Sequence, residues 1–300
     1  MPAVLNTNAA SLYAAKSLQN AQSKMAVSVE RLSSGLRINR ASDDAAGLGI
    51  SQALTSQING ADQGVRNLND GISLVQTAEG AIGAAQEMAQ RILALATQGA
   101  NGTMGNSERN AIRSEMRQLM TAIDGIGTRS KYAGVTLFTA STAIDLQASN
   151  VSTDKVTVSA ASLALIGCGT AAAGGYAGVG SVYSGGSTTG IALITRINEL
   201  ADDSLTAAKM LSIGADATSY IGTLNIQRSA LGAIQNQIEF TVSNVKELSS
   251  NITAARSNVQ DTDYASETAS LTKGQILQQA ATAMLAQANQ MPNVILSLLK

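Results

Sequence analysis

Few side chains in this sequence have the types and spacing that catalysis needs, and the chain contains no histidine. Asp43 and Asp44 are adjacent carboxylates, which elsewhere can act as a general acid and a general base. Without histidine or a metal motif, they fit better in the first turn of a helix, where carboxylates interact favourably with the helix dipole. We therefore predict that a helix begins here, with Ser42 as its N-cap residue.

Other reactive or ligand-binding features are also weak. Cys168 is the single cysteine, so an internal disulfide and a thiolate metal cluster are excluded. No histidine can activate it, and we interpret it as a small packed residue or an unused thiol. The glycines between 167 and 180 lack the Gly-Lys-Ser/Thr of a phosphate-binding loop. These features predict a protein that is not an enzyme, with no cofactor and no metal.

The composition favours helix–helix packing. Hydrophobic residues make up 45% of the 300 residues, but aromatics only 3%, so the apolar content is mainly Ala, Leu, Ile, Val and Met. Such residues suit narrow seams between helices. The formal net charge of −1 gives no electrostatic basis for nucleic-acid binding. The prolines are Pro2 and Pro292, so nearly all of the chain is free of the strongest helix breaker.

Hydrophobic repeats predict long helices at both ends of the chain. Near the N-terminus, Leu18, Met25 and Leu32 lie seven residues apart. Near the C-terminus, apolar positions are spaced alternately four and three apart: Leu277, Ala281, Met284, Ala288, Met291, Ile295 and Leu298. A heptad pattern keeps one apolar seam turned toward a partner helix. A two-helix seam of these residues buries little area, so we favour a polymerisation seam shared with other copies over a coiled coil within one molecule.

Between these ends, the apolar stripe of residues 54–75 continues to about residue 98, which predicts a helix of about 55 residues and about 80 Å. Residues 99–105 are typical of a turn, and a shorter helix follows with apolar positions from 112 to 126. Another long stripe covers residues 231–259. We therefore predict a mainly α fold, an extended rod of long antiparallel helices.

The middle of the chain has a different pattern. Residues 132–138, 144–147 and 155–158 have β-favouring side chains at alternating positions, with a turn-like segment over 148–154. They predict a small β-hairpin in the outer region. Residues 160–190 are rich in Gly, Ala, Ser and Thr, which is typical of an irregular cap or a flexible loop.

The sequence predicts no membrane insertion and no cleaved secretory signal. The charge-free stretch 156–195 is interrupted by glycines, whereas a spanning helix needs about 20 predominantly apolar residues. The N-terminus lacks a basic region followed by an apolar one.

Several motifs at both ends carry a family resemblance. They are Leu5–Asn8, Glu30–Asn39, Asp43–Leu48, Asp261–Ala265, Ala286–Gln290 and Leu296–Leu299. In this order, over roughly residues 1–140 and 220–300, the sequence resembles bacterial flagellin.

The resemblance implies a structural subunit that self-assembles into the helical flagellar filament and drives motility. Residues 1–42 and 258–300 would form an inner terminal coiled coil around a central channel. Residues 43–158 and 191–257 would form a helical shell with the hairpin, and 159–190 a variable segment facing solvent.

Partners and location also follow from the resemblance. Besides the chain itself, it implies filament cap and hook–filament junction proteins, and an export chaperone at the C-terminal segment. Family members are exported unfolded through a type III pathway, so we expect an extracellular protein of the bacterial flagellum. Family filaments switch between supercoiled forms, which would place bistable elements within residues 43–158.

Residues 90–98 resemble the flagellin segment that Toll-like receptor 5 recognises. Arg91, Leu95 and Glu115 match the receptor-contacting positions. Leu93 and Ala94 depart from the pattern, because many family members have an Arg-Glu pair there. The alternative interpretation is that these residues simply pack within the helical shell.

Two other functions remain as alternatives. A hook–filament junction protein also pairs terminal helices, but lacks the combination of motifs at 33–37 and 43–47. A surface adhesin would use residues 140–190 and predicts a binding pocket or carbohydrate affinity there.

Overall fold

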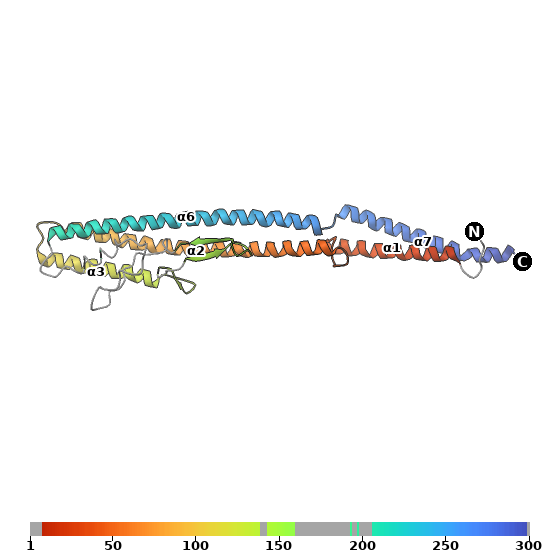
Figure 1. Cartoon of the computed structure of the whole chain (residues 1–300), viewed down its shortest axis with the longest axis horizontal. Coiled ribbons are helices and arrows are strands. Elements are labelled where there is room, and N and C mark those ends of the chain that lie inside the picture. The colour runs from red at the N-terminus through yellow and green to blue at the C-terminus, as the bar shows by residue number, and fades with distance from the viewer. Residues whose placement is uncertain (1–7, 139–142, 160–192, 194–196, 198–205, 299–300) are drawn as a thin grey trace. The chain divides into compact units, whose positions relative to one another are not determined.

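The computed structural model describes residues 8–138, 143–159, 193, 197 and 206–298. This part of the chain contains five helices and two antiparallel strand pairs, so the fold is mainly α, as predicted (Figure 1). The chain divides into two compact units, Met1–Ile58 with Ser250–Lys300, and Asn59–Ser249. The division predicted from the sequence, at residues 42, 158 and 258, stays a prediction. Cys168 and most of the segment 159–190 lie outside the described residues.

Helix α1 (Ala9–Ser34) has a cap at each end. The Asn8 side chain accepts a hydrogen bond from the Ser11 N–H at 3.1 Å. At the other end Gly35 adopts a left-handed conformation with φ of +73°, and its N–H donates to the Arg31 carbonyl oxygen. Glycine is the residue that adopts this conformation at least cost, which explains why the helix stops here.

Helix α2 (Ala45–Gly99) has 55 residues, the length predicted from the sequence. The prediction of Ser42 as its N-cap is wrong. Ser42 lies in a turn that the Asp43 N–H closes onto the Arg40 carbonyl oxygen, so the helix begins later. Asp44 is the cap, because its Oδ1 accepts from the Gly47 N–H at 2.9 Å. Asp43 lies before the helix, not in its first turn.

Helix α3 (Asn106–Arg129) follows the predicted turn. Arg109, in its first turn, is only 8% exposed, and its guanidinium donates to the carbonyl oxygens of Gly99 and Asn101, both at 3.0 Å. These carbonyls belong to the end of α2 and the residues after it. The arginine therefore satisfies acceptors that the end of a helix leaves free.

The strands form two hairpins. β1 (Lys131–Tyr132) and β2 (Val135–Thr136) are joined by Ala133 and Gly134, both with positive φ, as in a type I′ turn. Residues 132–138 are therefore not one strand, because this turn folds them back. The hairpin of β3 (Ile144–Gln147) and β4 (Lys155–Val158) is confirmed, with Ile144 opposite Val158.

Two further helices complete the described chain, α6 (Ala207–Gln260) and α7 (Tyr264–Leu298). The connection between them pairs with the residues after α1. The Arg37 N–H donates to the Gln260 carbonyl oxygen at 2.7 Å, and the Thr262 N–H donates to the Gly35 carbonyl oxygen at 2.9 Å. These bonds hold the start of α7 beside the end of α1.

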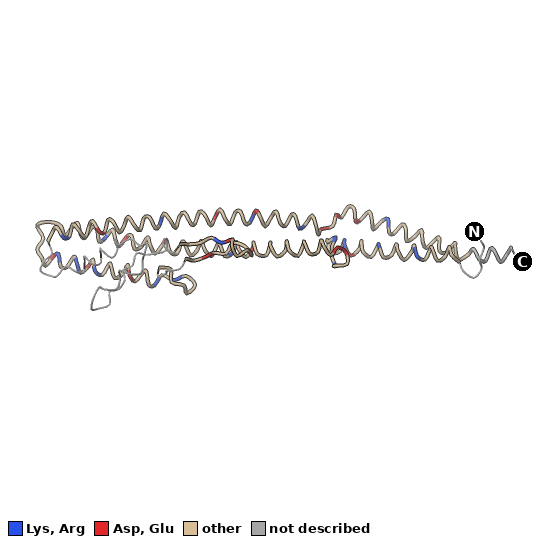
Figure 2. The backbone as a smooth tube through the Cα atoms, in the orientation of Figure 1, with Lys and Arg blue, Asp and Glu red and all other residues tan. Residues whose placement is uncertain are grey.

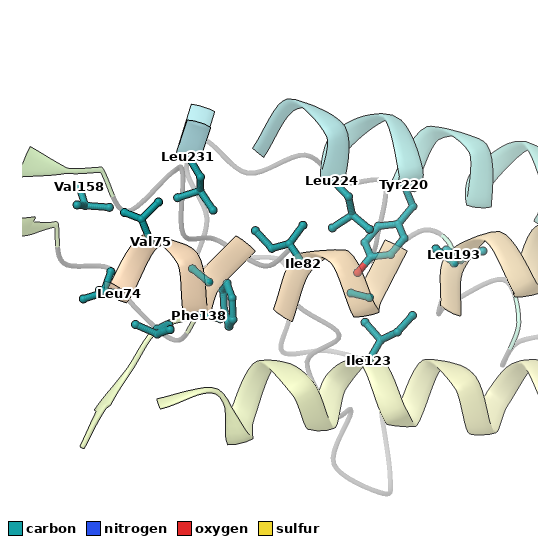
Figure 3. Packing of buried hydrophobic residues seen from close by; sticks show 14 of the residues in the cluster. Leu74, Val75, Ile82, Ile123, Phe138, Val158, Leu193, Tyr220, Leu224 and Leu231 are labelled. Atoms are coloured by element: carbon teal, nitrogen blue, oxygen red, sulfur yellow. The ribbon is translucent and has the colours of Figure 1, made fainter. Parts of the chain in front are cut away.

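The core of the unit Asn59–Ser249 is built from α2, α3, α6 and the β3–β4 hairpin. Ile82, Ile123 and Tyr220 are fully buried, and in Figure 3 Tyr220 of α6 and Ile123 of α3 point toward α2 from its two sides, while Ile82 of α2 points toward α6. Small buried residues of α2, such as Ala78, Ala85 and Ala89, keep the helices close. None of the helices in the described part of the chain contains an apolar stretch that could span a lipid bilayer.

Candidate assembly surface on the terminal helices

Helices α1 and α7 pack side by side (Figure 1) along a seam in which small residues alternate with larger ones. Buried and half-buried positions alternate three and four apart on both helices, as in a coiled coil. On α1 they are Ser11, Ala14, Leu18, Ala21, Met25, Ser28 and Leu32; on α7 they are Glu267, Leu271, Gly274, Gln278, Ala281, Leu285 and Ala288. A Cβ built at Gly274 would lie 3.6 Å from the Met25 Cβ, so the helices approach closely there.

The predicted seam residues divide into three groups. Leu18, Met25 and Leu32 are half-buried in the α1–α7 seam, and Ala281 and Ala288 are buried in it. Leu277 and Met284 lie at the edge of the seam and are 46% and 65% exposed. Met291, Ile295 and Leu298 lie within α7, but their side chains are outside the described part of the structure.

Helix α7 therefore carries two stripes that share Ala281 and Ala288. One stripe, with Gly274 and Gln278, faces α1 in the same chain. The other, with Leu277 and Met284, runs along the edge of the seam and is largely exposed. The sequence pattern predicted only the stripe that contains Leu277 and Met284. The stripe that faces α1 was missed because glycine and glutamine are not counted as apolar residues. Small residues spaced seven apart, Gly274, Ala281 and Ala288, were the signal for the first.

The exposed stripe of α7 borders an apolar groove with the start of α1. Leu277 and Met284 line a cavity of about 480 Å³ together with Tyr13 and the alanines between them. Tyr13 is 75% exposed, and Leu12 beside it is 64% exposed. A contiguous apolar patch of this kind is typical of a protein–protein interface.

Polar contacts fix both ends of the α1–α7 pair. The Asn8 Nδ2 donates to the Ala288 carbonyl oxygen at 2.7 Å, and the Ser11 hydroxyl donates to the Asn289 Oδ1 at 2.9 Å. At the other end Arg31 and Glu267 form an ion pair at 3.6 Å. The exposed groove is thus presented by two helices that hydrogen bonds hold in register.

The residues matched to receptor contacts lie on α2 and α3. The Arg91 Nε and Nη2 donate to the Glu115 Oε1 at 3.0 and 2.8 Å, and both side chains are about half exposed. Leu95 is 2% exposed and belongs to the core. Leu95 therefore packs within the helical shell, which agrees with the alternative interpretation. Arg91 and Glu115 instead form an ion pair on the surface. The receptor contact stays a prediction for all three.

The carboxylates of Asp43 and Asp44 accept hydrogen bonds from nearby backbone N–H groups. The N–H groups of Arg40 and Asn39 donate to Asp43 and lower the pKa of this carboxyl below its ordinary value of 3.8. Asp44 caps α2. Among the described residues, no group of three or more His, Cys, Asp or Glu side chains could hold a metal ion.

Comparison with known proteins gives matches over both ends of the chain. The bacterial flagellin N-terminal helical region matches residues 5–143, and the bacterial flagellin C-terminal helical region matches residues 216–299. The flagellar filament 33 kDa core protein of Treponema phagedenis is 36% identical over 302 residues, which cover 99% of this chain and 100% of that protein. Flagellin of Bacillus subtilis (strain 168) is 38% identical over 319 residues, which cover 99% of both chains.

A solved structure is also similar. The crystal structure of Bacillus cereus flagellin matches with a TM-score of 0.43 and 23% identity, covering 64% of this chain and 94% of that chain. The sequence matches define a class of proteins with a helical region at each end of the chain. The chain belongs to the bacterial flagellin family.

Proposed function

We propose that this chain is a structural subunit that self-assembles into the helical bacterial flagellar filament, with no catalytic role. The observation that carries the proposal is the exposed apolar stripe on α7, formed by Leu277 and Met284 beside Tyr13 of α1. These residues lie in the terminal helical regions that define the family.

The physical reason is the small area that the α1–α7 seam buries. Its buried residues are small: Ala21, Ser28, Gly274, Ala281 and Ala288. The larger Leu277 and Met284 remain 46% and 65% exposed. Burying a side chain of that size contributes about 1.5–3 kcal/mol. Contact with other copies would bury these exposed side chains and gain this free energy, so assembly is favoured over the isolated helix pair.

The finer parts of the proposal follow from family membership. We propose type III export in an unfolded state, an extracellular location in the flagellum and a role in motility. The corresponding partners are the filament cap, the hook–filament junction proteins and an export chaperone at the C-terminal segment.

Electron microscopy of purified protein after seeding tests this function. The full chain should form long filaments, and a chain without residues 263–300 should form none. Failure of the full chain to polymerise under any seeded condition would overturn the proposal. A hook–filament junction protein, the main alternative, should form short oligomers instead.

A second role, recognition by Toll-like receptor 5, is favoured by one observation. Arg91 and Glu115 are exposed together on neighbouring helices. A receptor reporter assay on the monomer should give a signal that Arg91→Ala reduces. The absence of any signal from the unsubstituted monomer would end this proposal.

A further inference from the structure

Charge is segregated along the terminal helices. The sequence contains no Asp or Glu in residues 1–29 or 268–300, and its charged side chains there are Lys16, Lys24, Lys273 and Lys300. All six carboxylates of the segments 30–44 and 256–267 lie where α1 ends and α7 begins: Glu30, Asp43, Asp44, Asp261, Asp263 and Glu267. In Figure 2 the charged positions along the described parts of α1 and α7 away from this junction are blue, whereas red and blue positions lie together at the junction.

The acidic junction keeps unpaired charge. Four arginines lie in the same segments, and two of them form ion pairs, Arg31 with Glu267 and Arg40 with Glu30. Within the part of the chain that the structure describes, Asp261 and Asp263 form no ion pair. They accept hydrogen bonds from the Ser257 hydroxyl and from the Ala265 N–H instead. Both are exposed in the three-residue connection before α7.

The opposite charge lies in a groove further along the same pair of helices. Lys24 of α1 and Lys273 of α7 line a cavity of about 450 Å³ with the half-exposed Val27 and Leu277. In the described residues neither lysine has a carboxylate partner. The groove also contains Arg31, whose Nε is buried without an acceptor in this part of the structure. The groove thus has more positive charge and more donors than its one carboxylate, Glu267, can satisfy.

We propose that the groove at Lys24 and Lys273 binds the Asp261–Asp263 turn of a second copy of this chain. Two carboxylates then face two ammonium groups, and Tyr264, which is 55% exposed beside the turn, packs against Val27 and Leu277. This inference rests on the proposed function, since it names a contact through which the subunits assemble.

A chain cannot fill its own groove with its own turn. About nine residues of α7 separate Tyr264 from Lys273, a distance of about 14 Å along the helix. The neighbour must therefore be displaced along the helix pair. A groove that receives a different surface of the next copy makes a heterologous contact. Such a contact repeats from copy to copy, and it generates an open filament when its rotation does not close into a ring.

Charge reversal with rescue by mixing tests the contact. The groove variant is Lys24→Glu with Lys273→Glu, and the turn variant is Asp261→Lys with Asp263→Asn. Asparagine caps a helix as well as aspartate, so the turn variant retains the start of α7. Alone, each variant places like charges in the contact, and its critical concentration for assembly should rise at least about tenfold.

An equimolar mixture of the two variants should assemble again, because each groove then meets a turn of opposite charge. Lys131→Glu with Lys246→Glu changes the net charge as the groove variant does and should assemble like the unsubstituted chain. The inference is overturned if either variant alone assembles normally, if the mixture stays impaired, or if the control loses assembly equally.

A neutral variant covers the case in which a reversed variant does not fold. Lys24→Gln with Lys273→Gln should weaken assembly and remove most of its salt dependence, because salt screens exposed charges. Unchanged salt dependence would overturn the inference. Assembly of the unsubstituted chain is measured first, and its absence would count against the proposed function itself.

Discussion

The backbone of Ala148 lies where a side chain of residue 64 would be. A Cβ built at Gly64 would lie 1.7 Å from the Ala148 carbonyl oxygen and 2.4 Å from its carbonyl carbon. Gly60 and Gly71 of α2 are similarly close to Asn150 and Leu146 of the β3–β4 hairpin. The hairpin therefore packs directly on the α2 backbone, and the Asn67 side chain adds a hydrogen bond to the Gln147 carbonyl oxygen at 3.2 Å.

Gly64→Ala should therefore displace the hairpin from α2. The methyl group meets backbone atoms, which cannot rotate away, so we expect a loss of about 1–3 kcal/mol in the free energy of unfolding. Thermal unfolding followed by circular dichroism measures it. Gly80→Ala is the matched control, since its Cβ would meet nothing within 4 Å and should stabilise α2 by about 0.5–1 kcal/mol. Equal effects of the two substitutions would contradict this packing.

Gly35→Ala tests the junction between α1 and α7. Gly35 has a φ of +73°, and a Cβ there would lie 3.1 Å from the Tyr264 hydroxyl oxygen. The left-handed conformation alone costs alanine about 1 kcal/mol, so unfolding of the helix pair should become easier by at least this amount. Hydrogen exchange at the start of α7 reports on it. Gly49→Ala, at an open position of α2, should not increase exchange there.

The positions of long elements were predictable from the sequence, whereas the contacts at their ends were not. The 55 residues of α2 and the two strands of the β3–β4 hairpin follow from regular side-chain patterns that local physics determines. Asp44 was missed as the cap because Ser42, Asp43 and Asp44 are all residue types that can cap a helix. The turn closed by the Asp43 N–H on the Arg40 carbonyl oxygen leaves Asp44 in the capping position. The type I′ turn at Ala133 was missed because alanine rarely adopts positive φ.

The assembly surface was partly predictable for a similar reason. Heptad spacing placed Leu277 and Met284 on one stripe with Ala281 and Ala288, but could not indicate which stripe faces α1. That choice depends on Gly274, whose missing side chain lets α1 approach. A hydrophobic pattern in the sequence identifies the apolar faces of a helix, whereas close packing between two helices requires a face with small residues.

The Arg91–Glu115 pair should contribute little to stability. Their side chains are 57% and 45% exposed, and exposed ion pairs contribute about 0–1 kcal/mol. A double-mutant cycle of Arg91→Ala and Glu115→Ala, measured by chemical unfolding, should give a coupling energy in this range. Loss of receptor signalling in Arg91→Ala would then reflect a lost contact and not unfolding. A coupling above about 2 kcal/mol would contradict this.

The β3–β4 hairpin should be sensitive to acid. Hydrogen bonds from Lys155 and Thr157 lower the pKa of Asp145 below its ordinary value of 3.8. Because the folded-state pKa is the lower one, the stabilisation is present above pH 3.8 and is lost as the pH falls through the folded-state value. Asp145→Asn should therefore weaken hairpin amide protection at neutral pH, with a difference from the unsubstituted chain that shrinks below pH 3.8. A difference independent of pH would contradict the assigned cause.

The critical concentration for filament assembly tests the central claim most directly, in the full chain and in Leu277→Ser with Met284→Ser. Both side chains are exposed in the single molecule, so circular dichroism should show unchanged helix content. Leu277 and Met284 are already partly buried, so contact with other copies can bury only the exposed 46% and 65% of these side chains. The double substitution then removes about 2 kcal/mol, and the critical concentration should rise about thirtyfold. An unchanged critical concentration, with filaments of normal length, would contradict the claim that this stripe drives assembly.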